Sequence, residues 1–110
     1  MRVLILGFES VNAVDAAMQK LIEESQCFIF TVVCGGLDKN NMTISMGEQW
    51  ARNNGAPIEY LFAENPEKLI DLLAWKCDYI VIKLKDDSPR WQKNLLMKMR
   101  AAGKHGTIVR

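Results

Sequence analysis

Three short segments of the sequence combine glycine, hydroxyl and charged residues at the end of an apolar run. The first run, residues 3–6, ends at Gly7, which is followed by Glu9 and Ser10. Glycine lets a backbone come close to a ligand, and the N–H groups at the start of a helix favour an anion. This segment therefore predicts part of a phosphate-binding site. The alternative is that Gly7 only permits a turn and Ser10 only caps a helix.

The second segment follows the apolar run of residues 27–34, which is rich in β-branched residues and too short to span a membrane. Gly35 and Gly36 come directly after it, and paired glycines behind a buried strand leave amides that can meet a phosphate or a sugar. The polar residues that follow, including Asp38 and Lys39, favour turns and predict a functional loop. A tight turn beneath an ordinary loop is the alternative.

The third segment is the loop after the fourth predicted strand, and it holds Lys85 and Ser88. In such a site Lys39 or Lys85 would neutralise a phosphate, and Glu9 or Asp38 would accept hydrogen bonds from ribose hydroxyls. The sequence thus predicts a phosphorylated small molecule as the ligand. It contains neither the G-x-G-x-x-G pattern of dinucleotide-binding folds nor a P-loop.

Nucleophilic and metal chemistry have little support in the sequence. Cys34 is a possible nucleophile, but the only histidine, His105, precedes the last predicted strand at the opposite end of the sheet. A buried structural thiol is therefore the favoured interpretation of Cys34. One histidine and scattered cysteines provide no metal-ligand spacing, so we predict no metal, no cofactor and no catalytic residue.

Composition and length indicate one globular domain spanning residues 1–110. A hydrophobic share of 49% and a charged share of 25% are ordinary for such a domain. The first apolar run is too short for a signal peptide, and the three cysteines form no C-x-x-C pair. We therefore expect a cytoplasmic protein with no membrane partner.

Helical and strand patterns alternate along the whole chain. Helical spacing of apolar residues covers residues 10–25, 45–53, 66–75 and 89–102, and short apolar runs cover 3–6, 27–34, 58–62, 79–82 and 107–109. Ser88 followed by Pro89 predicts a cap for the fourth helix. This alternation predicts an α/β fold, a three-layer Rossmann-like parallel sheet of five strands in the order 3-2-1-4-5 with helices on both faces. The third strand should lie at the sheet edge, and the ends of strands one, two and four should surround one crevice.

Two features of the helices concern partners. Trp50, Trp75 and Trp91 occupy apolar-face spacing, which predicts core packing. Residues 83–110 hold eight basic side chains against two acidic ones, so this part carries a net charge of +6 in a chain of net charge +1. A solvated helix face is the plainer interpretation, and a nucleic-acid-binding module that uses the basic fourth helix is the alternative.

The order of these features resembles the SLOG superfamily, in particular its small stand-alone YspA- and YpsA-like members. Those proteins open with a strand of the R-V-L-x-x-G type, as in residues 2–7, and a later strand runs into a Gly-Gly motif followed by a helix bearing Trp-Ala. The matching residues are Gly35-Gly36, Trp50-Ala51 and the closing Ala102-Gly103. The resemblance spans essentially the whole chain and implies a Rossmann-like fold that binds a nucleotide or a nucleotide derivative.

The sequence also departs from the family pattern. Lys39, Asn40 and Asn41 stand where the family has its third glycine, alanine and aspartate, and residues 85–89 replace the second phosphate motif, Pro-Gly-Gly-x-Gly-Thr. In the phosphoribohydrolase branch that motif runs into a helix with a glutamate needed for N-glycosidic cleavage, and no carboxylate side chain follows Asp87 here. The resemblance therefore implies a divergent nucleotide-binding protein without that activity. An N-glycosidic hydrolase or transferase is the alternative, and a homodimer through exposed helix faces is also expected.

Overall fold

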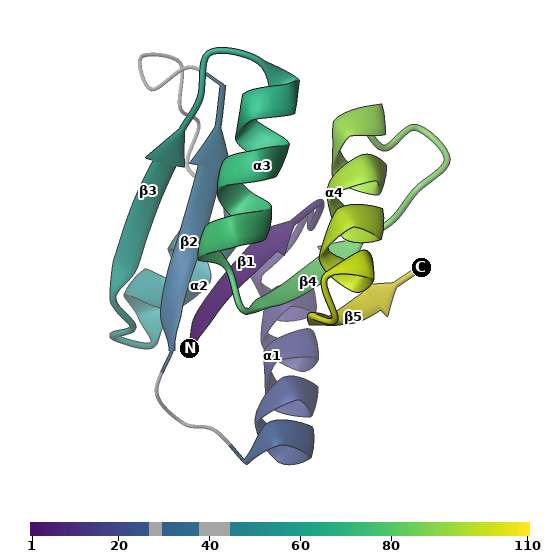
Figure 1. Ribbon diagram of the computed structural model, residues 1–110. Helices are drawn as coiled ribbons and strands as arrows, with labels where there is room; N and C mark the ends of the chain where they lie inside the picture. Colours follow the sequence, from purple (N-terminus) through teal and green to yellow (C-terminus); the bar gives the residue numbers. More distant parts are fainter. Residues whose placement is uncertain (27–29, 38–44) are drawn as a thin grey trace.

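Five apolar runs form one parallel sheet, and a helix follows each of the first four. The computed structural model describes residues 1–26, 30–37 and 45–110. The strands are β1 (Arg2–Leu6), β2 (Thr31–Gly36), β3 (Ile58–Phe62), β4 (Tyr79–Lys83) and β5 (His105–Val109), and the helices are α1 (Val11–Ser25), α2 (Met46–Asn53), α3 (Pro66–Lys76) and α4 (Arg90–Ala101). The strand order is β3-β2-β1-β4-β5, which confirms the predicted topology (Figure 1).

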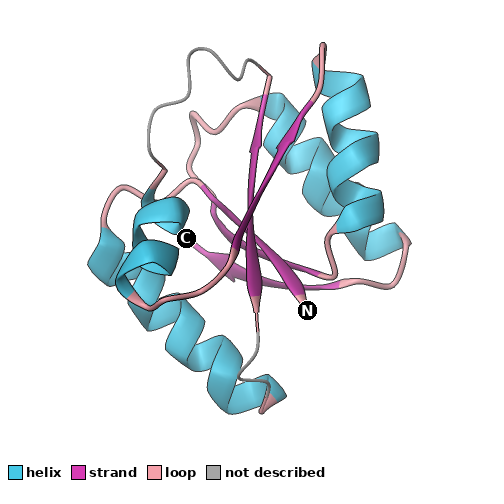
Figure 2. Cartoon of the chain, turned by 90° about the vertical axis from the view of Figure 1, so that its left-hand side faces the viewer, coloured by secondary structure: helices cyan, strands magenta, loops and turns pink. Residues whose placement is uncertain are grey.

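Helices cover both faces of the sheet, so the fold has three layers (Figure 2). Side chains of successive strand residues alternate between the two faces. In β1, Val3 and Ile5 join the apolar cluster beneath α1 and α2, whereas Leu4 joins the cluster beneath α3 and α4. The central strands β1 and β4 are buried on both faces, because each face packs on a helical layer.

The edge position predicted for the third strand is confirmed, since among the described strands β3 pairs only with β2. Its five residues are half-buried or exposed, and Pro57 lies just before it. Strand β2 differs from its predicted range of residues 27–34. It runs from Thr31 to Gly36, and residues 27–29 lie outside the described part of the chain.

Side-chain caps begin the first three helices. The caps are Ser10, Ser45 and Asn65, and each accepts a hydrogen bond from the backbone N–H three residues later at 2.9 to 3.1 Å. The cap predicted for the fourth helix is wrong. Pro89 occupies the N-cap position without a side-chain cap bond, and the Ser88 hydroxyl instead accepts from the Lys85 N–H at 2.8 Å.

The prediction that all three tryptophans pack in the core is wrong for Trp75. Trp50 is buried and donates its indole N–H to Asp15 at 3.0 Å, and Trp91 is half-buried against the core. Trp75 is 73% exposed. The inward side of α3 is set by Leu69 and Leu73, and a residue two positions after Leu73 lies more than half a turn around the helix.

The described helices include none that combines the length and the apolar character needed to cross a membrane.

Candidate functional site

Directly after β1, the backbone at Gly7 lies in close contact with the end of β4 at Lys83. Gly7 has φ +83°, and a Cβ at this position would collide with the carbonyl oxygen of Lys83. Only glycine meets both conditions, because L side chains rarely adopt this φ and no atom fits beside the carbonyl. Gly7 therefore has two roles: it permits the turn, as predicted, and it allows the ends of β1 and β4 to approach closely.

A charged pair links the loops that follow these two strands. The Lys85 ammonium group forms an ion pair with the Glu9 carboxylate. The hydrogen bond from Lys85, together with its charge, lowers the pKa of Glu9 below its usual value. The Glu9 side chain is 77% exposed and that of Lys85 is 31% exposed, so solvent screens the pair and an incoming anion can compete for the lysine.

Hydroxyl groups hold the two loops in shape. The Ser10 hydroxyl accepts from the Ala13 N–H at the start of α1. The Ser88 hydroxyl accepts from the Lys85 N–H, and the Ser88 N–H donates to the Lys85 carbonyl at 3.1 Å. The structure thus brings five predicted site residues to the ends of β1 and β4: Gly7, Glu9, Ser10, Lys85 and Ser88.

The start of α2 reaches the same end of the sheet. A Cβ on Gly47 would lie 2.8 Å from the Cβ of Ile5, closer than real Cβ atoms come. The lack of a side chain at Gly47 therefore lets the first turn of α2 pack directly on β1. A glycine that weakens the helix by propensity is required here by packing.

A cavity of about 250 Å³ lies between these segments. Gly7 and Phe8 line one side, and Ser45, Met46 and Gly47 line the other. Among the predicted site residues that the structure describes, only Gly7 is in its walls. Phe8 and the start of α2 were missed, although the helix predicted over residues 45–53 already places a helix N-terminus behind the second strand.

Gly35 and Gly36 do not follow β2, as predicted, but lie inside it. They pair with Leu61 and Phe62 of β3, and the Gly36 carbonyl accepts from the Ala63 N–H at 3.2 Å. The N–H and carbonyl of one strand residue point to the same side, so the Gly36 amide also faces β3 and is not directed at a ligand. The expectation of freely available amides is corrected for Gly36.

The missing side chains of the two glycines have different consequences. A Cβ on Gly35 would lie 2.9 Å from a methyl carbon of Leu73, so Gly35 makes room for α3. A Cβ on Gly36 would meet only the Phe62 ring at 3.6 Å, an ordinary contact. Gly36 is two residues from Cys34, so a side chain at this position would point to the face of the sheet that packs on α1 and α2.

Asp38 and Lys39, the remaining predicted ligand-binding residues, lie outside the described part of the chain, as do Asn40 and Asn41.

A buried carboxylate that the sequence analysis missed fixes α2 to the sheet edge. Glu48 is 4% exposed, and its carboxylate accepts from Arg52 at 2.8 Å and from the Tyr60 hydroxyl. The Tyr60 bond lowers the pKa of Glu48, and the same bond raises the pKa of Tyr60. The sequence Ser45-Met46-Gly47-Glu48 fits a capping box, in which the Glu48 carboxylate would instead accept from the Ser45 backbone N–H. Tyr60 comes from β3, a contact that no local pattern reveals.

Cys34 has the surroundings of a structural thiol. It is 5% exposed, and burial raises its pKa above the usual value. Its sulfur lies 3.8 Å from the Ser45 hydroxyl. His105 pairs with Tyr79 at the beginning of β4 and β5, at the other end of the sheet from the cavity. Within residues 1–26, 30–37 and 45–110, no three His, Cys, Asp or Glu side chains gather to hold a metal ion.

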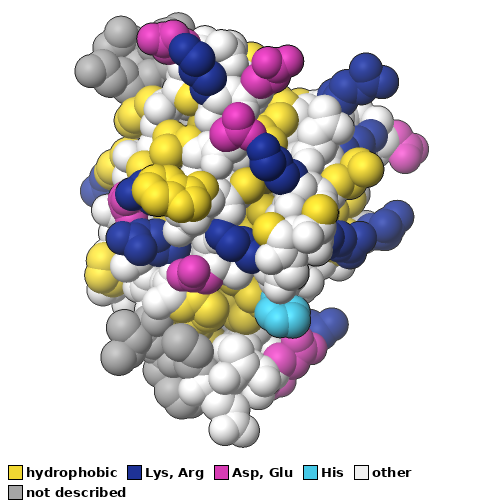
Figure 3. Space-filling model, in the orientation of Figure 1, with side chains coloured by type: hydrophobic (Ala, Val, Ile, Leu, Met, Phe, Trp, Pro, Cys, Tyr) yellow, Lys and Arg dark blue, Asp and Glu magenta, His cyan; other side chains and the backbone are white. Residues whose placement is uncertain are grey.

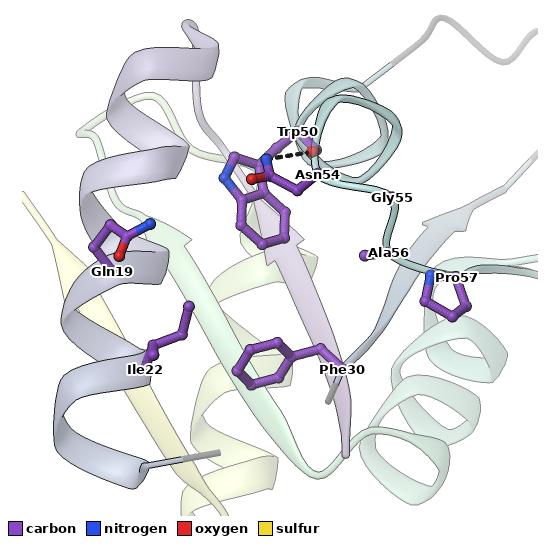
Figure 4. Close-up of a pocket in the computed structure, with 8 residues that line it drawn as sticks. All are labelled: Gln19, Ile22, Phe30, Trp50, Asn54, Gly55, Ala56 and Pro57. Atoms are coloured by element: carbon purple, nitrogen blue, oxygen red, sulfur yellow. Dashed lines mark hydrogen bonds between the residues drawn. The ribbon is translucent and has the colours of Figure 1, made fainter. Parts of the chain in front are cut away.

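A second cavity, of about 310 Å³, opens at the amino end of β3 (Figure 4). Its walls come from α1 and α2 and from the chain around Phe30 and Pro57, and Trp50 forms part of them. The Asn54 amide there donates to the Trp50 carbonyl at 2.8 Å. No charged side chain is among its described lining residues, so it lacks the groups that would hold a phosphate.

Comparisons with known proteins give a fold and no family. No family model matches the chain, and no curated protein matches it. The chain is similar in structure to one described as "Structure of the universal stress protein from Archaeoglobus fulgidus in complex with dAMP". The TM-score is 0.57 at 15% sequence identity, and the match covers 99% of this chain and 96% of the other. At this identity the likeness supports the α/β fold.

Proposed function

We propose that the protein binds a nucleotide or a nucleotide derivative at the carboxyl end of its sheet. The observation that carries the proposal is the cavity of about 250 Å³ between the Gly7 loop and the first turn of α2. Ligands of open parallel sheets bind outside the carboxyl ends of the strands, where the chain order reverses. In this sheet the reversal falls between β1 and β4, beside the same cavity.

The phosphate would lie at the start of α2. The first backbone N–H groups of a helix have no partner within the helix, and together with the helix dipole they favour an anion. Ser45 accepts from the Glu48 N–H, which leaves the N–H groups of Met46 and Gly47 at the cavity wall. Gly47 carries no side chain that could keep an oxygen away from these groups.

Lys85 would supply the positive charge. Its ammonium group now pairs with Glu9, and a phosphate dianion offers it more charge than one exposed carboxylate does. Once released, Glu9 would accept hydrogen bonds from ribose hydroxyls. Asp38 and Lys39 belong to the proposal as loop residues that follow β2, as does Ser10 at the start of α1.

We include membership of the SLOG superfamily in the proposal. Its support is the matching residues Gly35-Gly36, Trp50-Ala51 and Ala102-Gly103 in the sequence. The similar fold of the Archaeoglobus fulgidus protein, whose structure holds dAMP, supports nucleotide binding and has no bearing on SLOG membership. The absent second phosphate motif and the lack of a carboxylate side chain after Asp87 support a protein without phosphoribohydrolase activity.

A thermal-shift screen tests the proposal. AMP, dAMP, the other nucleoside monophosphates and cyclic or ribosylated derivatives would be compared with adenosine and with inorganic phosphate. A ligand at about 100 times its Kd adds about 2.7 kcal/mol to the free energy of unfolding, which raises Tm by roughly 10 °C in a domain of this size. If no phosphorylated ligand raises Tm, the proposal is wrong.

Two variants locate the site. Met46→Glu places a carboxylate in the cavity wall at the start of α2, beside the N–H groups proposed for the phosphate, and should repel it. Lys85→Ala removes the proposed phosphate cation. Lys98→Ala is the matched control, since Lys98 also pairs with an exposed carboxylate, that of Asp71, on the other side of the molecule. We expect the first two variants to bind at least tenfold more weakly and the control to bind normally.

The enzyme alternative has its own measurement. Incubation of the protein with nucleoside monophosphates would release free base if it cleaves N-glycosidic bonds. Among the described carboxylates near the cavity mouth, Glu9 could act as the acid or base, so Glu9→Gln should abolish any such release. We expect no release from the unaltered protein.

A further inference from the structure

Strand β5 leaves one edge of the sheet without a neighbour. Among the described strands it pairs only with β4, and Figure 1 shows no helix or strand beyond it. The Val109 carbonyl accepts from the Leu84 N–H at 2.8 Å, so Val109 directs its backbone groups toward β4. This direction alternates along a strand, and Gly106 and Ile108 therefore direct their N–H and carbonyl groups outward. The free edge thus offers two donors and two acceptors to a further strand.

The β5 edge lacks the features that normally discourage pairing with another chain. Those features are proline, charged side chains and bulges. The other edge strand, β3, follows Pro57 and carries Glu59, which pairs with Arg2. The five residues of β5 include no proline and no Asp, Glu, Lys or Arg, and their register with β4 is continuous from His105 to Val109. The β5 edge is therefore open to strand addition.

One flank of α4, formed by Lys93 and Arg100, lies on the side of this free edge. Lys98 marks the flank that faces α3, because it pairs with Asp71. Lys93 and Arg100 lie about 140° and about 160° around the helix axis from Lys98, and so on the opposite flank. Helix α4 contacts β5, whereas α3 contacts β2 and β3. The flank turned away from α3, here called the basic flank, is therefore the one nearest the β5 edge.

The basic flank is available to an anionic group. Both of its side chains are exposed, and neither forms an ion pair within the described residues. No acidic residue occurs in α4. Figure 3 shows Lys and Arg side chains on the right-hand side of the molecule, where α4 lies in Figure 1. A strand added beside β5 would therefore meet positive charge on its α4 side.

The other face of the edge favours an uncharged side chain. A cavity of about 380 Å³ lies there, and its walls include Leu21 and Glu24 of α1 together with Tyr79 and His105. Side chains of an added strand alternate between the two faces, so every second one would point to this side. Glu24 would repel an acidic side chain, whereas an apolar one could contact the Tyr79 ring. The two faces together select acidic and uncharged residues in alternation.

We propose that the free edge of β5 binds an extended acidic segment of a partner protein as a sixth strand of the sheet. Backbone hydrogen bonds to Gly106 and Ile108 would hold the segment, and acidic residues at alternate positions would pair with Lys93 and Arg100. A second copy of this chain fits less well, because a twofold axis at the edge would bring two basic flanks together. The proposal does not depend on the nucleotide cavity, which lies between the Gly7 loop and α2.

Fluorescence anisotropy with a labelled peptide tests the proposal. Glutamate and valine would alternate in the peptide over about six residues, the usual length of a strand. In the control peptide lysine replaces glutamate. We expect the acidic peptide to bind and the basic one not to bind. The affinity should fall when the ionic strength rises from about 0.01 M to about 0.15 M, which shortens the Debye length from about 30 Å to about 8 Å.

N-methylated peptides distinguish strand addition from attraction between charges alone. Methylation of a backbone nitrogen removes a hydrogen-bond donor and leaves the charge of the peptide unchanged. In an added strand only every second residue directs its N–H group at β5. Methylation of one alternate set of residues should therefore abolish binding, and methylation of the other set should leave binding nearly unchanged.

Charge variants of the protein test the basic flank. The double variant with Lys93→Glu and Arg100→Glu should bind the acidic peptide at least roughly tenfold more weakly, since two ion pairs are replaced by repulsion. The matched control combines Lys68→Glu with Lys98→Glu. It changes the net charge equally, but Lys68 lies on α3 and Lys98 on the flank of α4 that faces α3. We expect the control to bind the peptide normally.

A proline variant tests the edge itself. The Ile108 N–H points outward, so Ile108→Pro removes a donor from the free edge and leaves the hydrogen bonds between β5 and β4 in place. We expect this variant not to bind the acidic peptide, and circular dichroism would confirm that it is folded. If it does not fold, the N-methylated peptides and the charge variants still decide the question.

Several results would overturn the proposal. They are absence of binding by the acidic peptide at low ionic strength, equal binding by the basic peptide, and indifference to methylation of either set of residues. Sedimentation measurements add a further one: a dimer that Ile108→Pro abolishes, without any binding of the acidic peptide, would assign the edge to a second copy. Met46→Glu should bind the peptide normally, which separates this surface from the nucleotide site.

Discussion

Replacement of Gly7 by alanine should destabilise the protein far more than the same replacement at Gly103. The two glycines have nearly equal φ values, +83° and +77°, so both variants suffer similar backbone strain. Alanine in this conformation costs about 1–2 kcal/mol. A Cβ on Gly103 would have no atom within 4 Å, whereas a Cβ on Gly7 would collide with the Lys83 carbonyl oxygen. The difference between the variants therefore measures how closely β1 approaches β4.

The collision cannot be relieved cheaply. The obstructing atom belongs to the backbone of β4, whose pairing with β1 and β5 holds it in place. Separating the strand ends would break ladder hydrogen bonds and open the buried core beneath them. We estimate a further cost of at least about 3 kcal/mol for Gly7→Ala, in the range of large structural defects. In a domain of this length that corresponds to a loss of roughly 12 °C in Tm beyond the loss for Gly103→Ala.

Urea denaturation followed by tryptophan fluorescence would give both free energies of unfolding, with circular dichroism as a second probe. If Gly7→Ala does not fold at all while Gly103→Ala folds, the close approach of β1 and β4 is supported in the same way, because both variants carry similar backbone strain. Free energies of unfolding for Gly7→Ala and Gly103→Ala that agree within about 1 kcal/mol would show that the strand ends are not in contact and would refute this reasoning.

Three further outcomes follow from side chains elsewhere in the fold. Glu48→Gln should lower the free energy of unfolding by about 1–2 kcal/mol at neutral pH, because a charge-assisted bond is lost. The pKa of Glu48 is lowered in the folded state. Its contribution to stability is therefore present above the pKa of the unfolded state and is lost as the pH falls through the pKa of the folded state. In urea denaturation between pH 7 and 3, the free energies of unfolding of Glu48→Gln and the unaltered protein should therefore converge as the pH falls. Lys104→Met should cost about 2 kcal/mol in the same assay, since it leaves carbonyl oxygens at the end of α3 without a donor. Burial raises the pKa of Cys77 to about 12. In a variant whose other two cysteines are replaced by serine, Cys77 should therefore react with a disulfide reagent at pH 8 only after the protein unfolds. Rapid reaction of the folded variant would contradict this expectation.

Most of the fold could be predicted from local patterns. Strand and helix periodicities differ, and caps such as Ser10 and Asn65 use hydrogen bonds within one helical turn, so these signals lie inside short windows of sequence. The strand order followed from strict alternation, because short right-handed crossovers leave few other arrangements. The differences at this level were small: β2 ends at Gly36, two residues beyond the predicted end at Cys34, and Ser88 does not cap α4.

Much less of the candidate site could be predicted from local sequence patterns. Gly7, Glu9 and Lys85 could be predicted from their positions at the ends of strands. No local sequence pattern indicates that Glu9 and Lys85, on the loops after β1 and β4, form an ion pair. Gly35 and Gly36 were predicted as ligand contacts, whereas Gly35 is explained by the packing of Leu73.

By itself, then, the sequence determined the order and type of the elements and the topology of the sheet, because these follow from interactions between neighbours along the chain. Only the tertiary structure decided that Gly47 packs on Ile5, that Glu48 meets Tyr60, and that Trp75 points outward. Those contacts join segments far apart in the sequence, and whether they form depends on the distances and angles at which helices settle on the sheet. Periodicity determines which side of an element is buried, and it carries no information on which residue of another element will lie there.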